Sequence, residues 1–346
     1  MENQPGIAAP RVSAVIVTWN ARALLSPCID SLLAQDLPAN ELEILIVDNG
    51  SNDDTLAFLA VAYPGVTVVA LDHNLGFAGG ANAGIRAAAG EVIVLLNNDA
   101  VADPAFVRTA RDTLLAEPGA GAVTGWIILA DRYSPSTDGG LVDLRGRHWK
   151  IDASGGAALT NSTGNIVTGE GNGLDRDWLV PVDALTRTSG AVSGFSGGAV
   201  ALRRAALDAV GLLDERYFMY YEDTDLSWRL RAAGWTVLFS RESVVHHAHA
   251  ASSGTESWFF LFHNERNRIL FALKNAPAGL VAAAFARTIA SAMVALVRLR
   301  PAAAARKLHA VGSALRLAPS FARDRRAIAR TAVVGRAALA AGARAD

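Results

Sequence analysis

The sequence predicts an α/β fold in which helices flank a mostly parallel central sheet, with a helical appendage at the C-terminus. Up to Asn97, short apolar runs alternate with segments of helical spacing. Strands that alternate with helices of this length form right-handed crossovers and a parallel sheet covered on both faces. From Trp258 onward the chain is rich in Ala and Arg and has a predominantly helical pattern.

Each element has its own pattern. Strands are predicted where aliphatic residues run together, and helices where apolar residues recur at helical spacing. We expect strands at residues 12–19, 42–49, 66–71 and 91–96, and helices at 23–35, 56–63 and 79–90. Residues 130–190 are rich in Gly, Ser, Thr and Asp, which predicts loops and short strands. The sequence thus predicts a first domain over residues 1–257, with this insertion, and a basic helical region over 258–346.

The composition excludes several classes of protein. With 346 residues, 51% of them hydrophobic and 19% charged, the chain is not expected to be disordered. Cys28 is the only cysteine, which excludes an internal disulfide and a cysteine-rich metal site and favours a reducing, cytoplasmic setting. The first residues lack a signal-peptide pattern. No stretch offers about 18 uninterrupted apolar residues, so a membrane span is not expected.

Charge is distributed unevenly along the chain. From Lys274 to the end there are 13 Lys and Arg against 2 acidic residues, whereas residues 1–273 carry 19 against 31. Such a basic segment suits attachment to an anionic inner-membrane surface, where each basic residue adds about 1 kcal/mol. The alternatives are ordinary solvated helices packed on the first domain and a homodimer contact. No aromatic-and-basic recognition motif accompanies the charge, so nucleic acid is not an expected partner.

Polar residues follow the predicted strands at the edge where parallel sheets bind ligands. Thr18, Asp48, Asp72 and Asp99 all stand at carboxyl ends of strands. Asp48 is interpreted either as an Asx turn or helix cap, or as a carboxylate that accepts the imide N–H of uracil or thymine. In the second interpretation, a backbone group near Thr18 contacts another edge of the base.

The glycine-rich segment HNLGFAGGANAG, residues 73–84, is a poor match to a dinucleotide fingerprint. That motif belongs in the turn after the first strand, where this chain has TWNARALL, so a dehydrogenase is not favoured. Gly79 and Gly80 before a helix would let the backbone approach a phosphate at the helix N-terminus. Asn82 could then hold a ribose or sugar hydroxyl.

Two further clusters carry chemically active side chains. Glu222, Asp223 and Asp225 precede a helical pattern in which Asp225 and Arg229 form an i,i+4 pair. The preceding YFMYY would supply an apolar wall that raises the pKa of a carboxylate toward the range of a general base. In SVVHHAHAASSG, residues 243–254, three histidines lie within four residues and are candidate metal ligands.

Taken in order, these segments resemble the inverting nucleotide-sugar glycosyltransferases of family 2, which have the GT-A fold, and most closely the bacterial rhamnosyltransferase-like branch. The matching stretches are VSAVIVTWN, ILIVDNGSNDDT, HNLGFAGGANAGI, VLLNNDA, the segment from GFSGG to RAAGW, and HHAHAAS. Each motif alone is weak. Their common order and spacing over residues 12–253 make the resemblance specific.

The resemblance implies a role for each of these positions. The donor site would comprise residues at the nucleobase and along the ribose and diphosphate: Thr18, Asn20, Asp48, Asn74, Gly76, Gly79, Asn82, Asn98 and Asp99. Asn97-Asn98-Asp99 occupies the place of the family's D-x-D metal motif, so metal binding would rest on Asp99. His247, or alternatively His246, would assist it, and Mg2+ or Mn2+ suits such ligands.

The resemblance also implies a reaction. The metal would neutralise charge on the leaving diphosphate. Asp223, or alternatively Glu222, would remove the acceptor hydroxyl proton during attack on the anomeric carbon, and one displacement would invert the configuration. Gly197, Gly198 and Trp228 would border the acceptor.

The leading hypothesis is therefore a hexosyltransferase that uses dTDP-L-rhamnose, or another dTDP- or UDP-sugar, to build a cell-envelope polysaccharide. Its saccharide acceptor would be lipid-linked, and the enzyme would be cytoplasmic or peripheral at the inner face of the plasma membrane. A nucleotidyltransferase is disfavoured because no glycine-rich phosphate loop bearing Arg or Lys follows the first strand. A non-catalytic scaffold stays open because of Asn97, although the acids at 222–223 argue against it.

Overall fold

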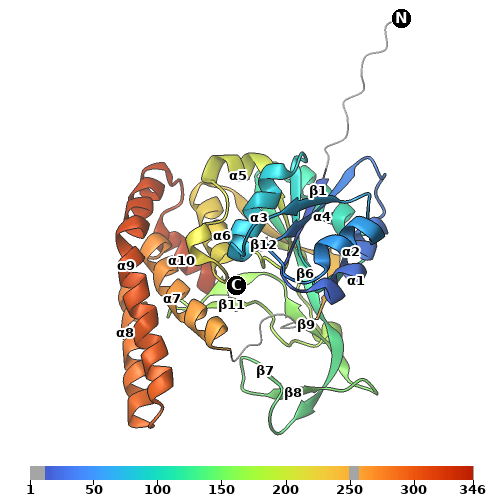
Figure 1. The fold of residues 1–346 in the computed structure, drawn as a ribbon. Coiled ribbons are helices and arrows are strands. Elements are labelled where there is room, and N and C mark those ends of the chain that lie inside the picture. Colours follow the sequence, from blue (N-terminus) through green and yellow to red (C-terminus); the bar gives the residue numbers. More distant parts are fainter. Residues whose placement is uncertain (1–11, 249–256, 346) are drawn as a thin grey trace, which may run out of the picture.

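The computed structural model describes residues 12–248 and 257–345. Its centre is a twelve-stranded mixed sheet with helices on both faces, and C-terminal helices form a further layer at one side (Figure 1). Along the sheet the strands follow the order β12-β14-β6-β13-β4-β1-β2-β3. The α/β class expected from the sequence is confirmed.

The four strands predicted in the first part form the parallel half of the sheet. Their bounds are β1 (Val12–Thr18), β2 (Leu42–Asp48), β3 (Thr67–Ala70) and β4 (Val92–Asn97). The helices that connect them are α1 (Arg22–Leu33), α2 (Thr55–Ala62) and α3 (Gly76–Ala87). β1 lies between β2 and β4, parallel to both. The carboxyl ends of these three strands therefore meet at one edge.

Beyond β4 the sheet becomes mixed. β13 (Ala199–Arg203) is antiparallel to β4 and β6, whereas β14 (Thr236–His247) is parallel to β6. The short strand β5 (Ala100–Ala102) pairs with the end of β14 and sets His247 opposite Ala100. β12 (Gly190–Val192) pairs with the start of β14. The last residues of β14 thereby arrive beside the end of β4.

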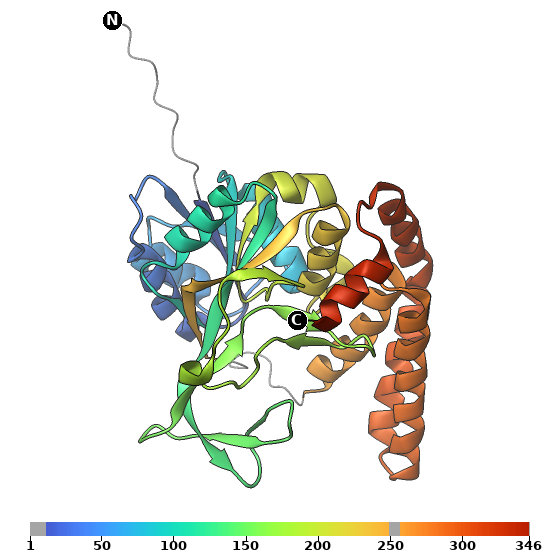
Figure 2. The same ribbon diagram turned by 180° about the vertical axis from the view of Figure 1, so that it is seen from behind.

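The insertion predicted at residues 130–190 grows out of one long strand. β6 (Ala120–Ser136) begins in the central sheet and continues beyond it, where β8 (His148–Ile151) and β9 (Ala157–Ser162) pair with it (Figure 2). β7 (Leu141–Val142) pairs with β8, and β10 (Asn165–Val167) pairs with β11 (Gly173–Asp175). The short strands are as expected. The sequence pattern does not indicate that they share a strand with the central sheet.

Helix α3 begins at Gly76, before the predicted start at Gly79. Gly79 and Gly80 therefore lie inside the helix. A Cβ on Gly80 would stand 2.6 Å from Cγ1 of Val17, so a glycine there lets the helix lie close to the sheet. The expectation that this glycine pair precedes the helix and opens its N-terminus to a phosphate is wrong.

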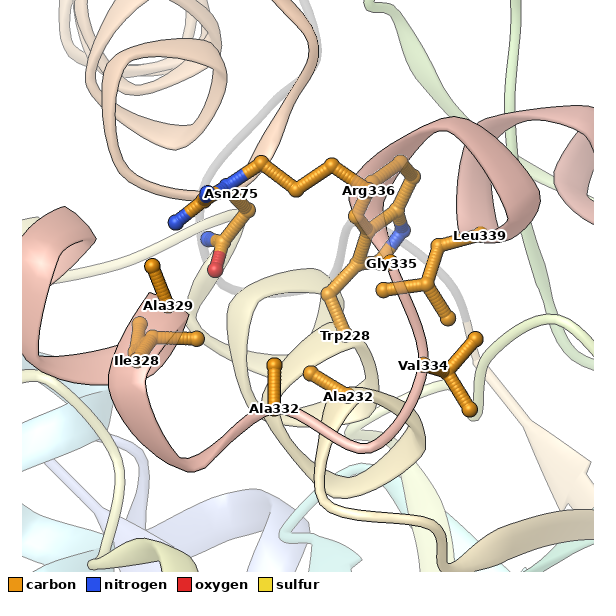
Figure 3. Close-up of a pocket in the computed structure, with 10 residues that line it drawn as sticks. All are labelled: Trp228, Ala232, Asn275, Ile328, Ala329, Ala332, Val334, Gly335, Arg336 and Leu339. Carbon is orange, nitrogen blue, oxygen red and sulfur yellow. The ribbon is translucent and has the colours of Figure 1, made fainter.

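Four helices follow residue 257: α7 (Trp258–Asn275), α8 (Ala278–Val297), α9 (Pro301–Thr331) and α10 (Arg336–Ala345). α7 packs against α6 (Glu222–Ala232) and also against α8 and α9, so it joins the helical layer to the sheet domain. Trp228 of α6 and Leu339 of α10 border a cavity of about 160 Å³ at this junction (Figure 3). By length and composition alone, α8 is the one helix in the described ranges that could cross a membrane, which is weak evidence.

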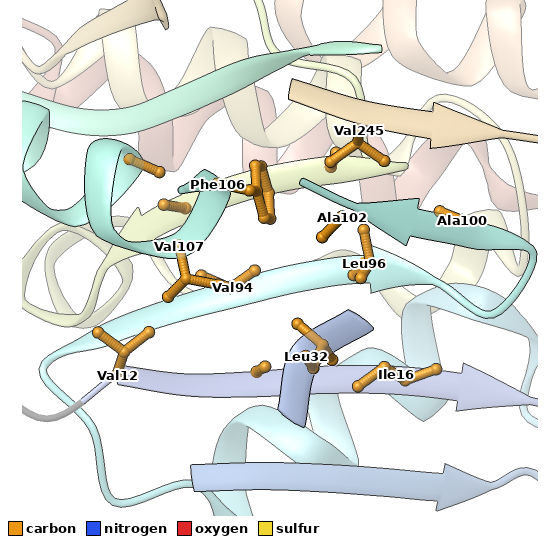
Figure 4. Packing of buried hydrophobic residues seen from close by; sticks show 14 of the residues in the cluster. Val12, Ile16, Leu32, Val94, Leu96, Ala100, Ala102, Phe106, Val107 and Val245 are labelled. Atoms are coloured by element: carbon orange, nitrogen blue, oxygen red, sulfur yellow. The ribbon is translucent and has the colours of Figure 1, made fainter. Parts of the chain in front are cut away.

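Apolar residues cover both faces of the central sheet. On one face, β1 and β4 pack against α1 and α4 (Phe106–Ala116) through a cluster that includes Val12, Ile16, Leu32, Val94, Leu96, Phe106 and Val107 (Figure 4). On the other face, α3, α5 (Arg204–Val210) and α6 cover Val15, Leu95 and Phe239. Because helices occupy both faces, a ligand has access to the parallel strands at their carboxyl ends.

Candidate active site

Thr18 and Asp48 lie side by side at the carboxyl ends of β1 and β2. They are partners in the strand register, and both are buried. Asn98 Nδ2 donates a hydrogen bond to Thr18 Oγ1 at 3.2 Å. Asp48 Oδ1 accepts from the Ser51 N–H at 3.4 Å, which ties it to the following loop. Three of the residues expected at the donor are thus brought together.

Asn20 fastens the loops that follow β1 and β2 to each other. Its Oδ1 accepts from the Asn52 N–H at 2.7 Å, and its own N–H donates to Ser51 Oγ at 2.9 Å. Asn20 has a φ of 48°, a left-handed conformation that Asn tolerates better than most residues. The two loops therefore form one rim beside Asp48.

A network around Asn49 closes the loop that precedes α3. Asn49 Nδ2 donates to Asn74 Oδ1 at 3.1 Å and to the Gly76 carbonyl at 3.0 Å, while its Oδ1 accepts from the Leu75 N–H. Asn74 Oδ1 also accepts from the Gly76 N–H at 2.8 Å. Asn74 and Gly76 therefore lie at this edge as parts of a closed loop. The sequence analysis did not single out Asn49, although its place directly after Asp48 was a signal.

Asn82 is engaged elsewhere. Its side chain is buried, and its Nδ2 donates to the Leu213 carbonyl at 2.8 Å and to Glu215 Oε1 at 2.9 Å. Its Oδ1 accepts from the Leu213 N–H at 3.1 Å. These bonds use both amide hydrogens and hold α3 to the segment before α6. The geometry does not support the expected contact between Asn82 and a sugar hydroxyl.

Asp99 meets His247 just beyond the end of β4. His247 Nε2 lies 3.0 Å from Asp99 Oδ1 and 3.3 Å from Asn97 Nδ2. On the other side of the ring, Nδ1 lies 2.7 Å from Oδ1 of Asn161 in β9. Because a carbonyl oxygen can only accept, Nδ1 donates to Asn161, and Nε2 faces the Asp99 carboxylate.

A carboxylate oxygen and an imidazole nitrogen at this separation share either a proton or a cation. A carboxylate oxygen with an imidazole nitrogen suits Mn2+, and Asn161 would orient the ring as outer-shell partners of metal-bound histidines do. Among the described residues, no group of three or more His, Cys, Asp or Glu side chains is placed to hold an ion. Asp99 and His247 could supply two ligands of a divalent ion, whose remaining ligands would have to come from a bound molecule or water.

His246 faces away from Asp99. Adjacent residues of a strand point to opposite sides, and His246 Nε2 lies 3.4 Å from Oδ1 of Asp103 at an exposed position. The geometry therefore favours His247 over His246 as a partner of Asp99. The third histidine of the cluster, His249, lies outside the described residues.

The two acids at the start of α6 have different surroundings. Asp223 is partly exposed, and its carboxylate accepts from the Gly197 N–H at 3.0 Å and the Thr224 N–H at 2.6 Å. Burial still raises the pKa of Asp223 above its ordinary value. Glu222 is buried, and its Oε2 has no hydrogen-bond partner in the described part of the chain. Burial, and then the Asp223 charge, raise the pKa of Glu222 well above its ordinary value.

The segment leading into α6 is strained and is held by α7. Phe218, Tyr220 and Tyr221 have positive φ values of 68°, 70° and 74°, each of which costs a non-glycine residue about 1 kcal/mol or more. Asn267 Nδ2 donates to the carbonyl oxygens of residues 217, 219 and 220 at 2.8 to 3.0 Å. Helix α7 therefore positions the acid pair, a role that the sequence did not indicate.

Asp225 forms the expected i,i+4 pair, with Arg229 Nε at 2.8 Å from its Oδ2. Lys274 Nζ and Asn275 Nδ2 of α7 also donate to its carboxylate, at 2.9 and 2.7 Å. Although burial opposes ionisation, Lys274 and Arg229 hold the pKa of Asp225 below its ordinary value. Asp225 is thus a structural residue that anchors α7.

Asp175 of β11 lies between the two halves of the site. Burial raises the pKa of Asp175 to about 6, although a hydrogen bond from Ser162 lowers it. The Asp223 carboxylate also raises this pKa, and His247 lowers it. A Cβ on Gly173, two residues earlier in β11, would lie 3.3 Å from Oγ1 of Thr224, and Ser162 follows Asn161, the partner of His247, so Asp175 is near both halves of the site. Asp175 was not predicted from the sequence, because only the pairing of β11 within the insertion brings it here.

Gly197 and Gly198 are adjacent in the chain, and they lie between the Asp223 half of the site and the half that contains Asn97 and His247. A Cβ on Gly197 would lie 3.5 Å from Cβ of Asp223, and one on Gly198 would lie 3.3 Å from Nδ2 of Asn97. Both glycines therefore border the site.

Trp228 lies outside this site. It is buried in an edge-to-face contact with Phe271 of α7, with ring centroids 5.1 Å apart, and it borders the cavity beside α10 (Figure 3). The expected contact between Trp228 and an acceptor is not supported.

Comparisons with known proteins agree with this architecture. Residues 13–177 match the model of the family described as Glycosyl transferase family 2. An N-acetylglucosaminyl-diphospho-decaprenol L-rhamnosyltransferase of Mycobacterium tuberculosis is 27% identical over 279 residues, which cover 74% of this chain and 82% of that protein.

Solved structures share the fold. The mannosyltransferase PcManGT from Pyrobaculum calidifontis, in complex with GDP-Man and Mn2+, aligns with a TM-score of 0.52 at 19% identity, over 95% of this chain and 89% of that one. S. aureus TarS 1-349 in complex with UDP gives 0.51 at 15% identity, over 93% and 90%. With the family match over residues 13–177, the mixed sheet and the polar strand ends, the comparisons support a family 2-like glycosyltransferase with the GT-A fold.

Proposed function

We propose that the protein is an inverting glycosyltransferase that moves L-rhamnose from dTDP-L-rhamnose to a lipid-linked saccharide at the cytoplasmic face of the membrane. The M. tuberculosis relative, named as an L-rhamnosyltransferase on a diphospho-decaprenol acceptor, supports this choice of sugar and acceptor class. Thr18, Asp48 and Asn98 form a polar cluster at the strand ends that would suit a pyrimidine edge. The product would serve cell-envelope polysaccharide synthesis.

Asp99 and His247 would hold a divalent metal, Mg2+ or Mn2+, together with the donor diphosphate. Bound there, the ion would neutralise charge on the leaving group. The position of His247 Nε2, 3.0 Å from Asp99 Oδ1 with Nδ1 held by Asn161, supports this assignment. Asn97 stands where the family usually has an acid, so the site has one negative charge fewer. Its Nδ2 lies 3.3 Å from Nε2 of the His247 ring.

Asp223 would take the proton of the acceptor hydroxyl. Its Oδ2 is aligned by the Gly197 N–H, and its raised pKa brings it closer to the range of an effective base. Glu222 is a weaker candidate, because it is buried and its raised pKa favours the neutral form. With the base on one side of the sugar and the leaving group on the other, a single displacement inverts the configuration.

The observation that carries the proposal is the contact of two adjacent glycines with both halves of the site. The Gly197 N–H donates to Asp223 Oδ2 at 3.0 Å, and the Gly198 carbonyl accepts from the N–H of Asn97, whose Nδ2 lies 3.3 Å from His247 Nε2. The base and the metal-side histidine can therefore act on one hexose. Asp175 has the properties to contact a sugar hydroxyl between them, since a carboxyl with a pKa of about 6 can both donate and accept hydrogen bonds near neutral pH.

Calorimetric titration with dTDP, UDP and GDP, with and without Mn2+, tests the donor assignment. We expect dTDP and UDP to bind more tightly than GDP, and Mn2+ to strengthen binding. A preference for GDP would overturn the pyrimidine assignment. Tighter binding of UDP than dTDP would redirect the proposal to a UDP-sugar, and no nucleotide binding at all would favour a non-catalytic scaffold.

A further inference from the structure

The end of the helical layer carries large apolar side chains that no described part of the chain covers. We define the hairpin tip as the exposed apolar residues of late α8, the turn after it and early α9: Ile289, Met293, Val294, Leu296, Val297, Leu299 and Leu308. Val297 and Leu299 are 82% and 88% exposed. A cluster of this kind on a folded surface commonly marks an interaction site.

The opposite side of α8 is packed on the protein. Ala284, Thr288, Ala292 and Ala295 are buried, and Arg268 of α7 donates to Thr288 Oγ1 at 2.6 Å. A helix held along one side, with an apolar stripe on the other, suits docking on a surface better than crossing a bilayer. α8 and α9 also form the outermost layer of the molecule (Figure 1).

The charge around the hairpin tip is positive. Arg298 and Arg300 are exposed in the turn between α8 and α9. The sequence contains no acidic residue between Glu265 and Asp324. A second copy of the chain packed symmetrically on this tip would set these arginines against each other. An anionic lipid surface instead satisfies both the arginines and the apolar side chains.

The insertion presents a similar surface at the same end of the molecule. The β7–β8 hairpin and the α8–α9 turn both lie at the lower end of the molecule, and the two opposite views agree on this (Figures 1 and 2). Leu144 and Ile151, 62% and 63% exposed, lie in and beside this hairpin, and Arg145 is exposed next to Leu144. Two separate projections at this end thus carry exposed apolar and basic side chains.

We propose that the hairpin tip docks the enzyme onto an anionic bilayer, with Val297 and Leu299 among the acyl chains and Arg298 and Arg300 at the phosphate groups. This deepens the proposed function, on which it rests for the lipid-linked acceptor: such an acceptor would be held at the surface that the enzyme binds. Docking itself needs neither nucleotide nor sugar, so its failure can be distinguished from failure of the donor assignment.

The test is co-sedimentation of the full chain with vesicles of phosphatidylcholine alone and of phosphatidylcholine mixed with phosphatidylglycerol. We expect binding to the mixed vesicles that weakens with salt. The double variant Val297→Glu, Leu299→Glu should lower the partition coefficient at least about tenfold. Val61→Glu, which changes an 85% exposed valine of α2, should leave it unchanged. Arg298→Gln with Arg300→Gln should reduce binding to the anionic vesicles selectively.

Nucleotide titration and sedimentation velocity on the same samples establish that the variants are folded and report their oligomeric state. Wild-type protein that does not bind mixed vesicles, or a double variant that binds as wild type does, would overturn the proposal. So would a wild-type dimer that the double variant converts to a monomer, since a second copy would then cover the hairpin tip.

Discussion

Lys274 Nζ lies 2.9 Å from Asp225 Oδ2 and also 2.7 Å from Asp214 Oδ2, and all three side chains are buried. This ion cluster ties α7 to the start of α6, where Glu222 and Asp223 stand. Although the sequence suggests a boundary before residue 258, the helix that follows it is bonded into the sheet domain.

Replacing Lys274 with Met removes the cation that the two carboxylates share. We expect the free energy of unfolding to fall by about 3–5 kcal/mol, as when one partner of a buried ion pair is removed. Urea unfolding measures this. Lys150→Met, in an exposed pair with Asp138, is the control and should cost less than about 1 kcal/mol. Equal stability of the two variants would contradict the anchoring role of Lys274.

Replacing Asp223 with Asn should abolish transfer and spare the donor site. Loss of a general base lowers kcat about 10²- to 10⁴-fold, whereas the nucleotide Kd should stay unchanged. Product formation from radiolabelled donor and calorimetry measure the two effects. Asp208→Asn, at an exposed position of α5, is the matched control. Normal turnover by the Asp223 variant would refute its role as base.

The two adjacent histidines provide a matched pair for the metal site. His247→Ala should remove most of the gain in nucleotide affinity that Mn2+ provides, because Nε2 of this ring faces Asp99. His246→Ala should retain that gain, since its ring faces Asp103. Titrations with Mn2+ and with EDTA measure the difference. Identical behaviour of the two variants would argue against metal ligation by His247.

Glu222 makes stability depend on pH. Its raised pKa means that the folded protein binds this proton more tightly than the unfolded chain, where the group titrates near 4.5. That stabilisation is fully present below the unfolded value and is lost as the pH rises toward the folded value. The variant Glu222→Gln cannot ionise there, so between about pH 5 and pH 8 it should lose less stability than wild type. Urea unfolding at both pH values measures the free energy of unfolding of the two proteins. If the difference between wild type and Glu222→Gln is the same at both pH values, this account is wrong.

Asp175 should influence the pH dependence of transfer. Its negative charge and that of Asp223 disfavour each other, so Asp175→Asn should lower the pKa of Asp223. The acidic limb of the kcat/KM profile should then move to lower pH, with reduced activity at neutral pH from the lost sugar contact. A lower but unshifted profile would mean that Asp175 does not couple to the base.

The fold and much of the strand-end site follow from local sequence. Apolar runs such as those of β1 and β4 can be buried only inside a covered sheet, and the polar residues after them necessarily reach one edge. The positions of Thr18, Asp48 and Asp99 were therefore predictable. So was the Asp225–Arg229 pair, which depends on helical spacing alone.

The rest depends on contacts between distant segments. Asn161 reaches His247 across 86 positions, and Asn82 is held by Leu213, 131 positions away. The composition of residues 130–190 indicates loops without showing which side chain turns toward the sheet. Motif spacing likewise gives the position of Trp228 but not the face of α6 on which it lies, which packing against α7 decides.

Gly76 and Phe218 bring the start of α3 into direct contact with the segment that precedes Asp223. Any side chain at Gly76 would overlap the carbonyl oxygen of Phe218, which also accepts from the Ala78 N–H at 3.2 Å. The start of α3 and the strained lead-in to Asp223 are thus packed tightly together. A hinge between these two segments would have to break this contact, so the structure favours an arrangement formed before substrates bind over one assembled anew in each cycle.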